Sequence, residues 1–230
     1  MEVEAGNEKL SRSPEVRAAI THLQQNGEVA LERDTRPGMM RADALTIARS
    51  IQVSRGEDPS NAGLRDRALI AIGFHGCLTN LQIAAIDVSH VQIGLSGDIL
   101  LKVRRPQGTS AWIILPQNDE ICLDPRKTLV DWLNVRTAAA GALFTPIDRH
   151  DVIRGNRLST DAIGHIVSRR AQDVGLRFPG AQSFRNGAVA QLAAQHRSIE
   201  EIGAELGYVE TVHLRPLVNA VYAERRKQPS

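Results

Sequence analysis

One segment interrupts an otherwise helical pattern and limits what this chain can fold into. Residues 88–116 read VSHVQIGLSGDILLKVRRPQGTSAWIILP, a run dominated by β-branched and other aliphatic residues. LSGD and RPQG supply turn residues inside it, and Pro116 closes it. The pattern predicts a three-stranded antiparallel sheet. Trp112 and Trp132 alternate with aliphatic residues, so we expect both in the core.

Helical periodicity surrounds this segment on both sides. Apolar residues recur at three- and four-residue steps before it and after it. The expected helices span 42–51, 61–74, 79–86, 125–139, 159–175, 183–195, 198–207 and 210–226. The predicted fold class is therefore mainly α with a small three-stranded antiparallel sheet (α+β), inserted after the second or third helix. A chain of 230 residues suits one such core.

The first 36 residues differ from the rest. Residues 13–24 predict a short helix, with Ser13 as its cap and Pro14 in its first turn. Residues 25–39 are polar, carry glycine and proline, and lack a sustained period, which is typical of a linker. We therefore divide the chain into an N-terminal piece, 1–36, and a main domain, 37–230.

Several classes of function find no support in the residue pattern. Cys77 and Cys122 are 45 positions apart without CxxC companions, so we expect neither a disulfide nor a zinc site. His75, His165 and His196 lack the partner spacing of a metal site or a catalytic triad. We expect no metal and no cofactor. The apolar runs are too short to span a membrane and the polar start is no signal peptide, so we expect a cytoplasmic protein.

The distribution of charge points towards phosphate. The formal net charge is only +2, but nearly all of the cationic residues are arginine, and several of them lie between Arg104 and Arg185. A guanidinium group can bond two phosphate oxygens at once, which makes nucleic acid a plausible partner.

Three strings, taken in order, resemble the catalytic domain of the tyrosine recombinases, the phage-integrase family. They are GLRDRALIAIGFHGCLTNLQIAAIDVSHV (63–91), LSTDAIGHIVSRRAQDVGL (158–176) and QSFRNGAVAQLAAQHRSIEEIGAELGYVET (182–211). The resemblance covers roughly 38–227 and implies double-stranded DNA as the partner. It also makes 1–36 similar to a remnant of that family's core-binding domain followed by a linker.

The resemblance implies a catalytic set that this chain retains only in part. The family cleaves DNA with a tyrosine nucleophile, a lysine in the sheet, two arginines and two histidine or tryptophan positions. Arg185 matches the second arginine. The other matched positions have lost the family's residue type, and they are Thr79 for the first arginine, Gln182 for a histidine, Tyr208 for the histidine or tryptophan, and Leu217 for the tyrosine.

Two further residues are candidates for the missing groups. Tyr222 lies five positions beyond Leu217, about 500° further round a helix, and so faces elsewhere unless Pro216 allows the segment to be rebuilt. Lys102 lies inside a strand, whereas Arg105 lies nearer the turn that carries the family's lysine. Arginine is a poor general acid because its pKa exceeds 12.

The DNA-binding candidates are the basic residues near these motifs: Arg104, Arg105, Arg169, Arg170 and Arg185. A structural ion pair is the alternative for Arg185, and a solvated helix face is the alternative for Arg169 and Arg170. By the resemblance, the C-terminal segment AERRKQPS can contact a neighbouring copy or another recombinase subunit.

Four functions remain open at this point. The first is a DNA-binding protein of the tyrosine recombinase type that is defective in strand cleavage. The second is an active recombinase with Tyr222 as nucleophile. The third is a helix-turn-helix regulator, because SIEEIGAELGYVETVHL also resembles that pattern. The fourth is a pure protein-interaction role.

Overall fold

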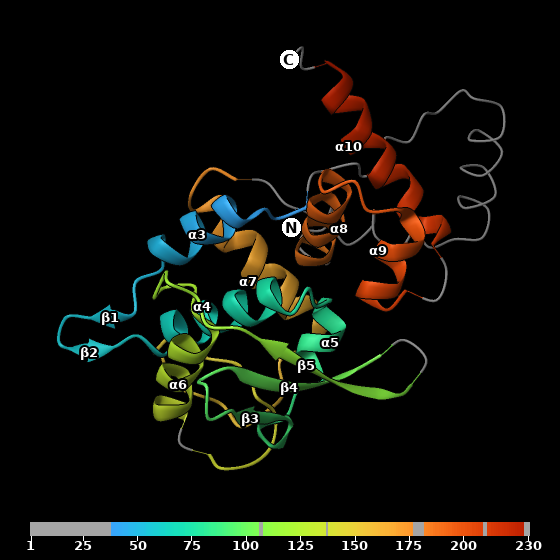
Figure 1. Cartoon of the computed structure of the whole chain (residues 1–230). Coiled ribbons are helices and arrows are strands. Elements are labelled where there is room, and N and C mark those ends of the chain that lie inside the picture. The colour runs from blue at the N-terminus through green and yellow to red at the C-terminus, as the bar shows by residue number, and fades with distance from the viewer. Residues whose placement is uncertain (1–37, 106–107, 137, 177–181, 209–210, 228–230) are drawn as a thin grey trace, which may run out of the picture. The chain divides into compact units, whose positions relative to one another are not determined.

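A computed structural model describes residues 38–105, 108–136, 138–176, 182–208 and 211–227 (Figure 1). The helix expected at 13–24, and the piece 1–36 as a whole, lie outside the described residues. The division at residue 36 therefore stays a prediction.

Helices make up about half of the described chain and are its main secondary structure, as the sequence predicts. They are α3 (Arg41–Ser50), α4 (Asn61–His75), α5 (Asn80–Ala84), α6 (Pro125–Arg136), α7 (Thr160–Gln172), α8 (Ser183–Ala194), α9 (Ile199–Leu206) and α10 (Arg215–Lys227), with short 3-10 turns η1 (Val88–His90) and η2 (Val212–Leu214). The single helix expected over 210–226 is instead η2 followed by α10. Pro216 explains the difference, because proline fits the first turn of a helix, where its missing N–H is not needed.

The predicted three-stranded antiparallel sheet is present. Its strands are β3 (Val91–Ile93), β4 (Ile99–Arg104) and β5 (Ser110–Leu115), in the order β3-β4-β5 (Figure 1). The register of β4 and β5 pairs Lys102 with Trp112 and Arg104 with Ser110. A separate hairpin of β1 (Ser54–Arg55) and β2 (Asp58–Pro59) connects α3 to α4.

Only one of the two tryptophans is in the core. Trp132 on α6 is fully buried, and its indole N–H donates to the carbonyl of Leu143 at 2.9 Å. Trp112 is 46% exposed, so its expected core position is wrong. Its strand alternates as predicted, but the side chain lies on the same open face as Lys102, which is also exposed.

Two hydrophobic cores organise the described chain. The larger one surrounds α4, which packs against α3, α6, α7 and α8, and it includes the buried face of the sheet. The smaller one lies between α8, α9 and α10 and contains Val189, Ile202 and Val218. Helix α8 contributes to both cores, because Phe184 in its first turn belongs to the larger one. No described helix has the length and apolar composition needed to cross a bilayer.

A close backbone approach fixes where α8 begins. The amide of Met39 donates to the carbonyl of Ser183 at 2.8 Å, and a Cβ at Gly187 would lie 2.1 Å from the Met39 carbonyl oxygen. We expect Gly187→Ala to lower the free energy of unfolding by about 1–3 kcal/mol, because backbone must move to admit the methyl group. Thermal denaturation measures this. Gly155→Ala is the control, since nothing lies within 4 Å of its added Cβ, and equal melting temperatures for the two variants would contradict the prediction.

Candidate nucleic-acid interface

A cavity of about 540 Å³ lies where α5, the end of β4 and the start of α8 meet. Its lining includes residues from three of the motif regions singled out in the sequence. They are Thr79 and Gln82 from the first, Arg104 and Arg105 from the sheet, and Gln182 and Arg185 from the last. Among the described residues that line it, the three arginines are the only charged side chains. The fold therefore brings widely separated candidates together in one cation-lined pocket.

Arg185 lies in the first turn of α8 and is only 4% exposed. Its Nη1 donates to Gln82 Oε1 at 3.2 Å, its Nη2 donates to the carbonyl of Leu206, and its Cζ lies 4.3 Å from the centre of the Tyr208 ring. Its Nε is buried and has no hydrogen-bond partner among the residues that the structure describes. No carboxylate of the described residues lies within ion-pair distance of Arg185. Dipoles and a π face, rather than an anion, surround this buried cation.

Gln82 connects the three parts of the pocket. Its Oε1 accepts from the amide of Thr79 at 3.0 Å and from Arg185, while its Nε2 donates to the carbonyl of Arg104 at 3.0 Å. Thr79 completes the arrangement as the N-cap of α5, because its hydroxyl accepts from the Gln82 amide at 3.2 Å. The T-x-x-Q spacing is a capping box, a sequence signal from which this role of Gln82 could have been found. The hydroxyl of Thr79 is thereby occupied in capping.

Tyr208 and Gln182 complete the set of matched positions near Arg185. Burial raises the pKa of the Tyr208 phenol, and the positive charge of Arg185 acts in the opposite direction. The phenol therefore stays protonated at neutral pH and can donate a hydrogen bond. Gln182 is exposed at the N-cap of α8 and makes no side-chain capping bond.

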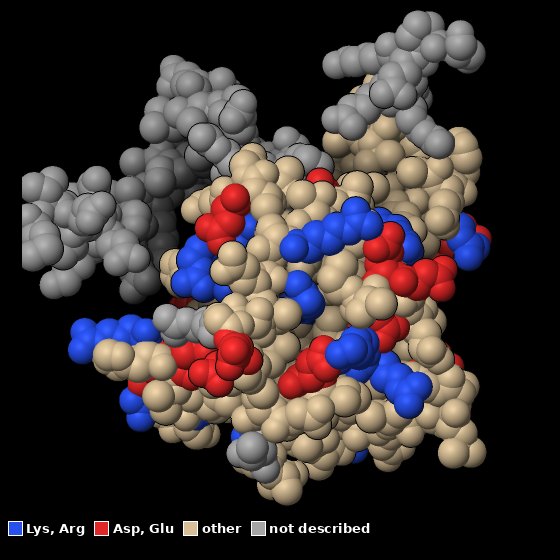
Figure 2. All heavy atoms as spheres, turned by 90° about the vertical axis from the view of Figure 1, so that its left-hand side faces the viewer, with Lys and Arg blue, Asp and Glu red and all other residues tan. Residues whose placement is uncertain are grey.

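The basic residues of the sheet face solvent. Lys102 and Arg104 alternate with buried residues along β4, so both point away from the core, and Arg105 follows in the turn. None of the three has an ion-pair partner among the described residues. These cations are therefore available to bind an anion. By contrast, on the face turned to the viewer in Figure 2, Lys and Arg side chains are interspersed with Asp and Glu.

Arg169 and Arg170 lie on α7 and do not line the pocket. The Nε of Arg170 donates to Asp66 Oδ2 at 2.8 Å, and Arg65 donates to the other oxygen of the same carboxylate through Nε at 2.8 Å. Asp66 is fully buried. Arg170 is thus part of a structural ion pair between α7 and α4, whereas Arg169 is exposed and 3.6 Å from Asp66. The structure gives Arg170 a role other than the DNA contact expected from the sequence.

Tyr222 and Leu217 lie on α10, away from Arg185. The Tyr222 hydroxyl donates to the carbonyl of Arg197 at 3.3 Å, just beyond the end of α8 at Ala194. At 1.5 Å per residue, the helix from Arg185 to Ala194 is about 14 Å long. Tyr222 therefore contacts the opposite end of α8, and Leu217 packs on the smaller core.

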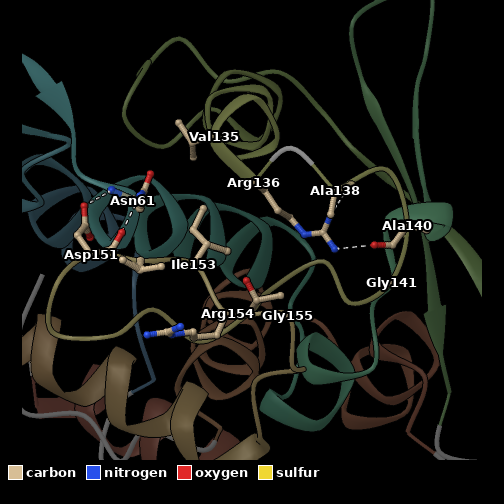
Figure 3. Close-up of a pocket in the computed structure, with 12 residues that line it drawn as sticks. Asn61, Val135, Arg136, Ala138, Ala140, Gly141, Asp151, Ile153, Arg154 and Gly155 are labelled. Atoms are coloured by element: carbon tan, nitrogen blue, oxygen red, sulfur yellow. Dashed lines mark hydrogen bonds between the residues drawn. The ribbon is translucent and has the colours of Figure 1, made fainter.

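A second cavity, of about 470 Å³, is a weaker candidate for a binding site (Figure 3). The carboxylate of Asp151 accepts the amides of Asn61 and Ala62 and so caps α4. The guanidinium of Arg136 donates to carbonyls of the loop that follows α6, including that of Ala140. Both charges therefore serve the fold.

Among the described residues, no cluster of three or more histidine, cysteine or acidic side chains could hold a metal ion.

Comparisons with known proteins agree with this fold. No family model matches the sequence. An integrase/recombinase xerD homolog of Selenomonas ruminantium is 29% identical over 141 residues, which span 59% of this chain and 41% of the relative. In the solved structures, the XerH site-specific recombinase bound to difH substrate matches with a TM-score of 0.58 at 15% identity, over 79% of this chain and 50% of that one. The XerA recombinase matches with a TM-score of 0.56 at 15% identity, over 85% and 66%.

The resemblance to the tyrosine recombinases is thereby confirmed. The chain has the fold of their catalytic domain, and the segment that matches the curated relative is less than half of that relative's length.

Proposed function

We propose that this protein binds double-stranded DNA, with a backbone phosphate seated in the cation-lined pocket beside Arg185. The observation that carries the proposal is a guanidinium that is 4% exposed, has no carboxylate partner in the described chain, and has a buried Nε without a hydrogen bond. Removing a cation from water is costly unless a counter-charge compensates. A phosphate would supply that charge and accept a hydrogen bond.

Two further observations support a phosphate as the ligand. Arg104 and Arg105 line the same cavity, and the capped N-terminus of α5 brings no acidic group into it. The XerH recombinase, whose structure has a similar fold, is bound to its difH substrate in that structure. Because its proposed partner is DNA, we also propose that the protein is cytoplasmic.

A binding titration at several salt concentrations tests this function. If three arginines neutralise phosphates, the logarithm of the duplex binding constant should fall with the logarithm of salt with a slope of about −3. Fluorescence anisotropy of a labelled random-sequence duplex measures it. Absence of binding at low salt would refute the proposal.

We further propose that strand cleavage is defective. Thr79 is neutral and occupied as a helix cap, Gln182 cannot exchange protons near neutral pH, and Leu217 has no nucleophilic group. Loss of one preorganised donor typically lowers a rate by about 10²–10³-fold.

The remaining tyrosine candidate gives a direct test. We expect no covalent protein–DNA adduct on a nicked suicide substrate, because the Tyr222 hydroxyl lies at the far end of α8 from Arg185. Denaturing electrophoresis detects the adduct. Tyr222→Phe should give the same result as the unaltered protein on the gel, without an adduct, and should bind duplex DNA with the same affinity. An adduct formed by the unaltered protein and lost in the variant would favour the alternative, an active recombinase with Tyr222 as nucleophile.

A helix-turn-helix regulator is less favoured. The exposed side of α9 carries acidic residues, and Arg197 lies 3.6 Å from Glu201 and 3.8 Å from Glu205. An acidic surface repels phosphate.

A contact with a second subunit through the C-terminal segment stays a proposal. The described part of α10 packs on α8 of the same chain.

A further inference from the structure

The open face of the three-stranded sheet combines an aromatic ring with cations. On β5, Trp112 is 46% exposed and Ile114 is 66% exposed. On β4, Lys102 lies directly opposite Trp112, and Arg104 lies two residues further along on the same face. Side chains opposite each other in antiparallel strands have Cβ atoms about 5 Å apart. An apolar surface and two positive charges therefore lie side by side.

The charge of this face is of one sign. β3, β4 and β5 contain no acidic residue, and their only charged residues are Lys102 and Arg104. Both cations line a hollow of about 170 Å³ together with Ser110 and His90. Ser110 supplies a hydroxyl and His90 an imidazole, so the hollow offers donors as well as positive charge. Trp112 is not part of the lining of this hollow, but it lies directly opposite Lys102, which is.

The sheet face also adjoins the pocket beside Arg185. Arg104 lines both the small hollow and the larger cavity, and its carbonyl accepts a hydrogen bond from Gln82. One nucleic-acid strand could therefore contact both places without leaving the basic surface. An apolar surface for a protein partner would not need this row of cations, whereas successive phosphates and bases match both components.

We propose that the open sheet face binds single-stranded DNA, with an unpaired base stacked on Trp112 and the adjoining phosphate held by Lys102 and Arg104. This inference rests on the proposed DNA-binding function and adds a strand-specific site to it. Duplex DNA keeps its bases stacked on each other, so it can use the cations but not the indole ring. Single strands offer a free π face, and stacking of that kind tolerates any base sequence.

The chain carries its own reporter for this interaction. It has only two tryptophans, and Trp132 is fully buried with its N–H bonded to Leu143. A change of indole fluorescence on adding an oligonucleotide therefore reports on Trp112. We expect a 15-residue oligothymidylate to quench this fluorescence strongly and a 15-base-pair duplex to quench it little. Trp112→Phe should abolish the quenching.

Affinities of matched variants complete the experiment. By anisotropy, Trp112→Ala should weaken oligothymidylate binding by about 5- to 150-fold, the range that loss of one stacked base implies. Duplex affinity should change less than about twofold, because phosphate contacts dominate it. Ile121→Ala, which alters a 70% exposed residue outside the sheet, is the control and should change neither affinity. Circular dichroism verifies that each variant is folded.

Each outcome decides between the two proposals. Unchanged oligothymidylate affinity in folded Trp112→Ala would overturn the single-strand site while leaving duplex binding intact. Failure of the unaltered protein to bind duplex, with quenching by the single strand retained, would refute the proposed function and support this site. A shift in sedimentation of Trp112→Ala without a change in oligonucleotide affinity would make the face a protein contact and also overturn the inference.

Discussion

Asp66→Ala is expected to lower the free energy of unfolding by about 3–5 kcal/mol, because it leaves buried guanidinium groups without their anion. Asp66 is fully buried, the Arg65 side chain is 6% exposed, and the Arg170 side chain is 19% exposed. The carboxylate accepts from Arg65 and Arg170, and so it joins α4 to α7 across 104 residues of sequence. Urea denaturation measures the loss.

Asp131→Ala is the matched control on another helix of the same core. Its ion pair with Lys127 is an i,i+4 pair on α6, in which the Lys127 side chain is 54% exposed and the Asp131 side chain is 31% exposed. Exposed pairs of this kind contribute less than about 1 kcal/mol. If the two variants unfold at the same urea concentration, the Asp66 carboxylate does not hold the two helices together.

The sheet illustrates both the success and the limit of prediction from sequence. β-branched runs and turn residues were sufficient for three antiparallel strands, because both signals are local. Trp112 was wrongly predicted to lie on the buried face of β5, because alternation defines two faces of a strand without saying which one the helices cover. The neighbouring strand β4 indicates which face is exposed. Lys102 lies opposite Trp112, and a lysine is rarely buried.

For the candidate site, the sequence indicated which residues take part but not all of the contacts between them. The resemblance to a recombinase indicated Thr79, Gln182 and Arg185, and all three line one cavity. The sequence did not predict that Leu206 and Tyr208 enclose the Arg185 guanidinium, because that contact depends on how α9 ends beside α8. A pattern in sequence fixes residue types on an element, whereas packing fixes the distances between elements.

The ion pair around Asp66 shows the same limit. Adjacent Arg65 and Asp66 belong to a string typical of the recombinase helix, and the string gives no sign of Arg170 as a third member. For that reason the sequence did not predict that Arg170, a candidate for DNA contact, forms an ion pair with Asp66 that joins α7 to α4. Arg170 and Arg185 are both helical arginines, but of the two only Arg170 has an ion-pair partner among the described residues. Substitution of each can therefore separate a structural role from a DNA contact.

Arg185→Met is expected to weaken duplex DNA binding at least about tenfold and to reduce the salt slope by about 1, while the free energy of unfolding changes by only about 1 kcal/mol. The affinity falls because the variant lacks the guanidinium that would contact a phosphate. The stability changes little because two opposing effects nearly offset each other. Methionine loses the bonds to Gln82 and Leu206, but it also removes a buried cation that has no carboxylate partner in the described chain.

Arg65→Met is the matched control, since Arg65 is 5% exposed and Arg185 is 4% exposed. Arg65 contacts a carboxylate, so its loss should destabilise the fold, yet duplex affinity measured below the melting temperature should be unchanged. Arg185→Lys adds a second comparison, because it keeps the charge without the planar fork and should recover only part of the affinity. If Arg185→Met binds duplex as tightly as the unaltered protein, the buried guanidinium has a structural role and the phosphate site must lie elsewhere on the basic surface.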